Sequence, residues 1–377
     1  MPFKHYLMTP GPTPVPRRVA LAMAQPLPHH RSPSFERIFA ECRQGLKWIF
    51  GTLQEVLVQS SSGTGALEAA LVNMCRQDDE VIYVNGGKFG ERWGQIASAY
   101  GLKTHEIRVP WGEAVDPALV RRALSDAPSA AALCVQACES STGIAHPIRE
   151  LAELTRHSDT CLVVDAVSAL GAMPLPMDEW GIDVLLTASQ KALMLPPGLA
   201  FSAASPKAWS RIEHADLPRF AFDWRAELAT QRHDRARWTP AISLIMGLAE
   251  VLRWLREETL DSVYARHDRL ARAARAAMEA MGLTLFAKVP AASITTVNCP
   301  VDSELLVELL RDSYGVGLVG GQDAAKGKIF RIAHLGYFDD FDIVVAVAAI
   351  ERGLAELGHQ AVPFGTGVGA ALKVFSA

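Results

Sequence analysis

The chain has 377 residues, enough for two domains that each bury a full core. Hydrophobic residues make up 49% and charged residues 21% of the sequence, which excludes an intrinsically disordered chain. The formal net charge of −4 gives no broad electrostatic basis for binding nucleic acid or an anionic membrane, and we expect neither partner.

The N-terminal segment, residues 1–20, is rich in proline, with the run Thr9 to Pro14 at its centre. Proline fixes φ and lacks an N–H donor, so this composition predicts an extended arm without a helix. The start, Met1 to Leu7, lacks the charged-then-apolar order of a signal peptide, and no apolar run approaches the ~20 residues of a membrane-spanning helix. The scattered cysteines are typical of reduced thiols, so we expect a cytoplasmic protein without a metal site.

Strand-like and helical segments alternate between residues 50 and 205. Such alternation predicts an α/β fold with a mostly parallel sheet between helices. Ligands of these sheets bind beyond the carboxyl ends of the strands, so polar residues there are the first candidates for a site. The apolar runs that we interpret as strands are 56–58, 80–84, 132–136, 161–165, 183–186 and 199–202, and helical segments include 65–74 and 90–100.

Two long helices are expected next, over residues 243–257 and 260–281. The remaining chain mixes strand-like segments (293–297 and 329–333) with helical ones (304–314 and 341–357), which predicts an α+β unit. We interpret the apolar, glycine-rich tail, 363–377, as packed irregular chain with a short helix. The sequence thus predicts an arm (1–20), a large domain (21–257) and a smaller C-terminal domain (258–377).

A run of serine, threonine and glycine, Ser60 to Glu68, follows the first predicted strand and opens a helix. Glycine lets a ligand approach the backbone, hydroxyls add donors, and a helix N-terminus favours an anion. The run therefore indicates a phosphate cradle, although it matches neither a Walker A loop nor a dinucleotide-binding fingerprint. An ordinary turn with a helix cap is the alternative.

Two charged residues stand at strand ends. Asp165 closes an apolar strand and needs a cation or a hydrogen-bond donor there, and Lys191 lies in an apolar stretch that would suit its amine to imine formation. Taken singly, Asp165 could be a cap or an ion-pair partner and Lys191 a surface lysine. Together with the cradle they form the set that pyridoxal 5′-phosphate (PLP) requires: a phosphate site, an acid for the pyridinium nitrogen and a Schiff-base lysine.

Motifs along nearly the whole chain resemble the class V aminotransferases of PLP fold type I, in particular the alanine/serine–glyoxylate aminotransferase group. The resemblance implies a mostly parallel, seven-stranded-type sheet between helices, and a smaller α+β domain. It also implies a ping-pong transfer of an amino group from alanine or serine to glyoxylate or pyruvate. The motifs that carry it are Thr9 to Pro14, Ser62 to Glu68, Asn85 to Trp93, Glu139 to Gly143, Asp165 to Gly171, Ser189 to Ala192, Pro196 to Gly198 and Thr239 to Leu244.

The resemblance implies a role for each matching residue. Lys191 would hold PLP as a Schiff base and move the proton at the substrate Cα, while Asp165 would pair with the pyridine nitrogen. Arg331 would bind the substrate carboxylate as a two-pronged fork, and the backbone of Gly11 would line the substrate pocket. The remaining cofactor contacts would be Ser62, Gly63, Thr64 and Gln190 around the phosphate, Phe89 and Val167 on the two ring faces, and Ser140 near the ring oxygen.

A homodimer with shared sites is also implied. Thr239 would reach the phosphate of the neighbouring subunit's cofactor, and we expect the extended arm to lie across another surface as well. The alternative for Thr239 is a simple N-cap of the following helix.

Several alternatives stay open at this point. Ala169 stands where family members often have a second serine, which leaves the amino donor open, with aspartate as the alternative. A desulfurase is disfavoured because Gln190 replaces the usual histidine before the lysine and Cys299 lacks a Gly/Ser-rich loop. A non-catalytic PLP-fold subunit is the alternative from another class, and His334 has no assigned role.

Overall fold

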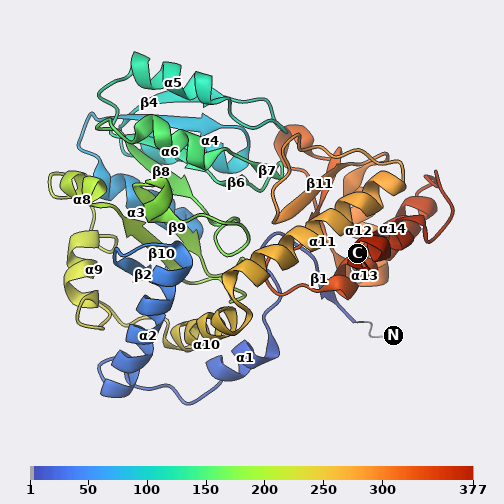
Figure 1. Ribbon diagram of the computed structural model, residues 1–377, viewed down its shortest axis with the longest axis horizontal. Helices are drawn as coiled ribbons and strands as arrows, with labels where there is room; N and C mark the ends of the chain where they lie inside the picture. The colour runs from blue at the N-terminus through green and yellow to red at the C-terminus, as the bar shows by residue number, and fades with distance from the viewer. Residues whose placement is uncertain (1–3, 377) are drawn as a thin grey trace.

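A seven-stranded sheet forms the centre of the larger part of the protein (Figure 1), in a computed structural model that describes residues 4–376. The strand order is β2-β10-β9-β8-β5-β3-β4, and within this sheet only β10 runs antiparallel to its neighbours. The predicted α/β fold with a mostly parallel sheet is confirmed. The strands are β2 (Val56–Gln59), β3 (Glu80–Asn85), β4 (Lys103–Arg108), β5 (Ala132–Gln136), β8 (Cys161–Asp165), β9 (Val184–Ala188) and β10 (Ala200–Ala204).

Helices cover both faces of this sheet because its central strands are apolar on both sides. In β8, Leu162 and Val164 pack into one layer of the core while Cys161 and Val163 pack into the other, as the alternation of side chains along a strand requires. One layer contains α2 (Pro33–Phe50), α5 (Pro117–Asp126), α6 (Ile148–Thr155), α7 (Met177–Trp180) and α10 (Ile242–Glu258). The other contains α3 (Gly63–Met74), α4 (Lys88–Ala99), α8 (Pro206–Ile212) and α9 (Trp224–Gln231).

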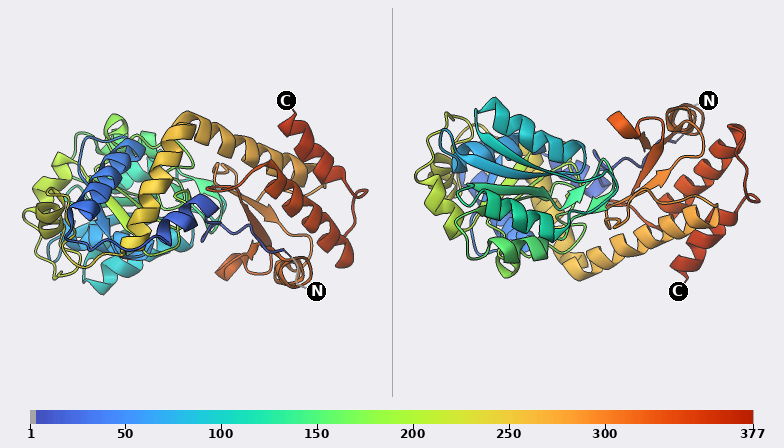
Figure 2. Two further views of the ribbon diagram at one scale, coloured as in Figure 1. Left: turned by 90° about the horizontal axis from the view of Figure 1, so that it is seen from below. Right: turned by 90° about the horizontal axis from the view of Figure 1, so that it is seen from above.

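The C-terminal part lies at one end of the molecule, beside the seven-stranded sheet (Figure 2). A three-stranded antiparallel sheet, in the order β11-β14-β13, packs there with long helices. A domain boundary at residue 258 stays a prediction. The elements are β11 (Ile294–Asn298), β12 (Val316–Gly317), β13 (Val319–Gly320), β14 (Ile329–Ala333), α11 (Leu260–Ala280), α12 (Ser303–Tyr314), the 3₁₀ turn η1 (Asp323–Ala325), α13 (Asp340–Glu356) and α14 (Thr366–Phe375).

The N-terminal arm differs from its prediction at its C-terminal end. Its end is helical, because Pro16, with φ −61°, stands just before α1 (Arg17–Met23), where a missing N–H costs no helical hydrogen bond. The arm also packs on its own chain, since β1 (Tyr6–Leu7) pairs in parallel with β12 and the Thr13 hydroxyl donates to the carbonyl of Lys191 at 2.8 Å. Residues 1–3 of the predicted arm, and Ala377 of the tail, lie outside the described residues.

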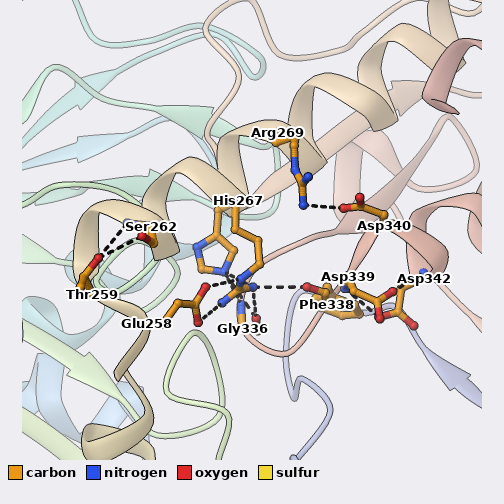
Figure 3. A network of polar contacts seen from close by, with 11 residues as sticks. Glu258, Thr259, Ser262, His267, Arg269, Gly336, Phe338, Asp339, Asp340 and Asp342 are labelled. Atoms are coloured by element: carbon orange, nitrogen blue, oxygen red, sulfur yellow. Dashed lines mark hydrogen bonds and ion pairs between the residues drawn. The ribbon is translucent and has the colours of Figure 1, made fainter. Parts of the chain in front are cut away.

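Polar contacts connect the larger part of the molecule with the C-terminal part near the start of α11 (Figure 3). The guanidinium of Arg266 binds the Glu258 carboxylate at 2.7 Å and donates to the carbonyl of Gly336 at 2.9 Å. The imidazole of His267 accepts a hydrogen bond from the Gly336 N–H at 3.0 Å. Gly336 has φ +90°, and a Cβ there would lie 3.1 Å from the Lys191 carbonyl oxygen. The backbone of Gly336 thus packs directly against the loop that carries Lys191.

Candidate active site

A cavity of about 270 Å³ lies beyond the carboxyl ends of the parallel strands. It is where the switch-point rule for such sheets places a ligand. All of the predicted site residues line it except Thr239 and Arg331. Those that do are Gly11, Ser62, Gly63, Thr64, Phe89, Ser140, Asp165, Val167, Gln190 and Lys191.

Lys191 lies on a short loop between β9 and β10, which are antiparallel neighbours, so both ends of the loop are fixed. The Lys191 ammonium donates to the carbonyl of Pro10 in the arm. Loss of hydration lowers the pKa of this amine to about 8, and the nearby negative charge of Asp165 opposes that effect. A Cβ on Gly11 would lie 2.3 Å from the Lys191 Nζ, so the arm approaches the amine as closely as only glycine allows.

Asp165 is the last residue of β8 and is buried, with 5% of its surface exposed. Its Oδ1 accepts the N–H of Val167 at 2.8 Å, and no ion pair of Asp165 is found in residues 4–376. It is therefore neither a helix cap nor half of a structural salt bridge. Burial raises the pKa of its carboxyl group to about 6, so the site favours a cationic or proton-bearing partner for it.

The serine and glycine run forms the first turn of α3. The hydroxyl of Ser62 caps the helix by accepting the N–H of Gly65 at 3.3 Å, so the cap alternative is correct for this side chain. The N–H groups of Gly63 and Thr64 have no acceptor in the described chain and remain available to an anion. A buried side-chain oxygen of Gln190 also has no partner at this cavity.

This set of groups fits PLP. Free N–H groups at a helix N-terminus suit the phosphate, the buried carboxylate of Asp165 suits the pyridinium nitrogen, and the desolvated amine of Lys191 suits the aldehyde. Among residues 4–376, no three His, Cys, Asp or Glu side chains are grouped as metal ligands would be. No helix in that range is long and apolar enough to cross a membrane.

Glu139 has a structural role that the sequence did not indicate. Its carboxylate is fully buried and accepts the N–H groups of Phe89 at 3.0 Å and Gly90 at 2.8 Å, together with the Ser141 hydroxyl at 2.6 Å. Burial raises the pKa of this carboxyl group, and the hydrogen bonds oppose the rise. These bonds fix the first turn of α4, which holds Phe89 at the cavity.

Three further polar residues line the cavity: Arg92, Cys138 and Ser168. Arg92 follows Phe89 by three positions, which places both on one face of α4, and this spacing could have identified it. Ser168 lies in the motif Asp165 to Gly171 but had no predicted role, and no comparable signal in the sequence marks Cys138.

Arg331, in β14, lies behind the lining rather than in it. Its guanidinium donates to the carbonyl of Ser140 at 2.9 Å and, through two nitrogens, to that of Gly320 at 2.9 and 3.1 Å. Three of its five N–H donors are thus in use. Each terminal nitrogen has one N–H left, and together these two can bind the two oxygens of a carboxylate. Burial lowers the pKa of the guanidinium to about 10, and the charge of Glu139 opposes this.

Thr239 and His334 lie outside the cavity. Thr239 is exposed in the loop before α10, and the N-cap of that helix is Ala241, so the alternative that Thr239 caps the helix is wrong. His334 is buried in the C-terminal part, where its ring lies 2.9 Å from the Thr295 hydroxyl. We interpret it as a core residue of the small sheet.

Comparisons with known proteins agree with this geometry. The family model for aminotransferase class-V matches residues 5–336. The small subunit of a soluble hydrogenase from Synechococcus sp. is 42% identical over 99% of both chains. An L-aspartate–glyoxylate aminotransferase from Paracoccus denitrificans is 35% identical over 97% of this chain and 94% of that protein. The crystal structure of ureidoglycine–glyoxylate aminotransferase from Bacillus subtilis superposes with a TM-score of 0.93 at 27% identity, covering 100% of this chain and 99% of that one.

Proposed function

The chain belongs to the class V aminotransferases, which depend on PLP, and we propose that it transfers the amino group of alanine or serine to glyoxylate or pyruvate. The observation that carries this proposal is the meeting of a desolvated lysine, Lys191, with a buried carboxylate, Asp165, in one cavity. The names of two of the relatives, both glyoxylate aminotransferases, support glyoxylate as the acceptor.

The residues of the cavity would divide the reaction as follows. PLP, when bound, supplies a ring that withdraws electrons from the substrate Cα. Lys191, whose desolvated amine is partly neutral near pH 8, would hold the cofactor at its aldehyde carbon; once the substrate amine had taken its place there, the freed amine would carry the proton to and from the substrate Cα. The carboxylate of Asp165 would keep a proton on the ring nitrogen.

Arg331 would bind both substrates in turn. In a ping-pong reaction the donor leaves as an oxo acid before the acceptor enters, so one carboxylate site serves both. The two free N–H groups of Arg331 match that task, and its bonds to Ser140 and Gly320 hold the guanidinium in place.

A small donor is supported by the charges of the cavity. A dicarboxylic donor such as aspartate needs a second cation, and the only arginine that residues 4–376 of one chain contribute to the lining, Arg92, is hydrogen-bonded to Thr64 at the phosphate cradle. The name of the Paracoccus relative nevertheless favours aspartate as the second candidate.

An amino-acid panel tests the donor. Alanine, serine and aspartate are mixed singly with PLP-loaded protein, and loss of the absorption band of the lysine-bound cofactor is followed in a single turnover. Alanine or serine should react fastest, and glyoxylate should restore the band. Reaction with aspartate alone would reject the proposed donor, and no reaction with any amino acid would favour a non-catalytic subunit.

We also propose a homodimer with shared sites. Thr239 is exposed and outside the cavity of its own chain, and beside it the rings of Phe220 and Trp238 lie 5.5 Å apart, 73% and 46% exposed. Exposed aromatic residues at such a position suit a subunit contact, which would place Thr239 at the partner's phosphate.

Subunit exchange tests this proposal. Lys191→Ala and Thr239→Ala chains, each inactive alone, should regain part of the activity when mixed, because one site of the hybrid is then intact. The matched control mixes Lys191→Ala with Asp165→Asn; both lesions affect a chain's own site, so that mixture should stay inactive. Inactive Lys191/Thr239 mixtures with verified exchange would show that each site comes from one chain.

A cytoplasmic location is the third part of the proposal. The six cysteines are free thiols and five of them are buried, which suits a reducing compartment. Cell fractionation with an antibody against the chain tests it, and recovery outside the cytoplasmic fraction would contradict it.

A further inference from the structure

Arg92 faces the cavity without a carboxylate partner. Its guanidinium donates to the hydroxyl of Thr64 at 3.2 Å and lies 4.8 Å from the centre of the Phe89 ring. No ion pair of Arg92 occurs in the part of the chain that the structure describes, whereas Lys88 on the same helix pairs with Glu91 at 2.9 Å. An arginine held by a hydroxyl and an aromatic ring keeps most of its donors free.

The bond from Arg92 also decides what the Thr64 hydroxyl can do. Because the Thr64 oxygen accepts the hydrogen bond, its own hydrogen is left for another acceptor. That hydroxyl lies in the first turn of α3, beside the free N–H groups of Gly63 and Thr64. Arg92 and the helix terminus thus converge on one place where an anion would bind.

A phosphate ester carries more negative charge than a helix N-terminus alone can balance. Such a group carries about −1.5 to −2 charges at pH 7, while a helix N-terminus offers the equivalent of about half a positive charge. Among the residues that line the cavity, Lys191 is committed to the aldehyde end of the cofactor, which leaves Arg92 as the remaining cation.

We propose that Arg92 is an anion-binding residue of the cofactor site, which neutralises the PLP phosphate and turns the Thr64 hydroxyl toward it. The proposal rests on the placement of the phosphate at Gly63 and Thr64 inferred above. Its consequence for specificity is that Arg92 is not free to bind a second carboxylate of a dicarboxylic donor.

Binding of PLP and of pyridoxal, which lacks the phosphate, separates this role from a structural one. The dissociation constants of both aldehydes are measured with cofactor-free protein by fluorescence titration. Arg92→Met should weaken PLP by about 10- to 100-fold and change pyridoxal by less than ~2-fold, because a lost charge-assisted bond affects only the phosphate form. Arg92→Lys should restore part of the PLP affinity. Lys88→Met is the matched control and should change neither constant.

Each other result overturns the proposal in a distinct way. Unchanged PLP affinity in Arg92→Met excludes the residue from the phosphate site, and a raised KM for aspartate in that variant assigns it to the substrate. Equal weakening of PLP and pyridoxal shows that Arg92 only supports the local structure. Thr64→Ala removes only the hydroxyl that Arg92 is proposed to turn toward the phosphate: if this variant keeps full PLP affinity, that part of the proposal is wrong, while the backbone N–H groups of the cradle remain. If Thr64→Ala weakens PLP while Arg92→Met does not, only the role of Arg92 fails.

Discussion

Replacing Asp165 by asparagine should make the cofactor-free protein more stable and the enzyme nearly inactive. Burial raises the pKa of this carboxyl group from 3.8 to about 6, and about two units correspond to ~3 kcal/mol. Below pH ~4 the carboxyl is neutral in both the folded and the unfolded chain and does not lower the free energy of unfolding. Because its folded-state pKa is raised, the wild type loses stability as pH rises from ~4 through ~6. Asparagine does not ionise, and its Oδ1 can still accept the Val167 N–H.

Thermal unfolding of cofactor-free protein, followed by circular dichroism at pH 4 and pH 7.5, measures this difference. The Tm difference between Asp165→Asn and wild type should be about 4 °C larger at pH 7.5 than at pH 4. This value is the free-energy difference of ~3 kcal/mol divided by the unfolding entropy expected for a chain of this length. Activity of the PLP-loaded variant should fall at least ~100-fold, since an amide cannot hold the ring nitrogen protonated. Asp159→Asn, at an exposed carboxylate, controls for net charge. A Tm difference that is the same at both pH values would refute the reasoning.

Three further predictions concern single residues of the site. Borohydride reduction of PLP-loaded protein should label Lys191, and a label on another lysine would contradict the assignment. Binding of PLP to the amine should become faster between about pH 6.5 and 8.5, because the amine, with a pKa of about 8, loses its proton there. Arg331→Lys should raise the KM of amino and oxo acids about 10-fold or more and leave PLP binding unchanged, because lysine lacks the two-pronged fork; a change in PLP affinity alone would place Arg331 elsewhere. Gly11→Ala should strongly slow the binding of PLP to the Lys191 amine, since the new Cβ meets that amine and φ at this position is +143°. A normal rate of binding in Gly11→Ala would show that the arm can move away from the amine.

The strands of the site were predictable because they are buried on both faces and therefore appear as continuous apolar runs. Strand β8 is an example, with all five residues from Cys161 to Asp165 buried. Strand β4 escaped prediction because it is an edge strand that is mostly accessible to solvent, whereas β2 at the other edge is fully buried. Of its residues only Ile107 is buried, and the alternation of Lys103, His105 and Arg108 with other polar residues gives no strand signal.

The same logic separates the site residues that could be found from those that could not. Asp165 and Lys191 were visible because each is a charge at the end of an apolar run. Glu139 was not, because its burial depends on contacts with Phe89 and Gly90, about 50 positions earlier in the chain. Nor could the sequence show that Arg331 is held by the Ser140 carbonyl, since that contact joins the two parts of the molecule.

Because β1 pairs with β12, a strand that is synthesised first can form its pairing only after most of the chain has been synthesised. Tyr6 leaves the ribosome early but pairs with Val316, which at about 5–20 residues per second follows roughly 15–60 s later. Until then the arm has no β-strand partner, and only contacts such as that of the Thr13 hydroxyl with the Lys191 carbonyl can hold the wall that Gly11 and Pro12 add to the cavity. The strand pairing that anchors the start of the arm is therefore completed only on a nearly complete chain.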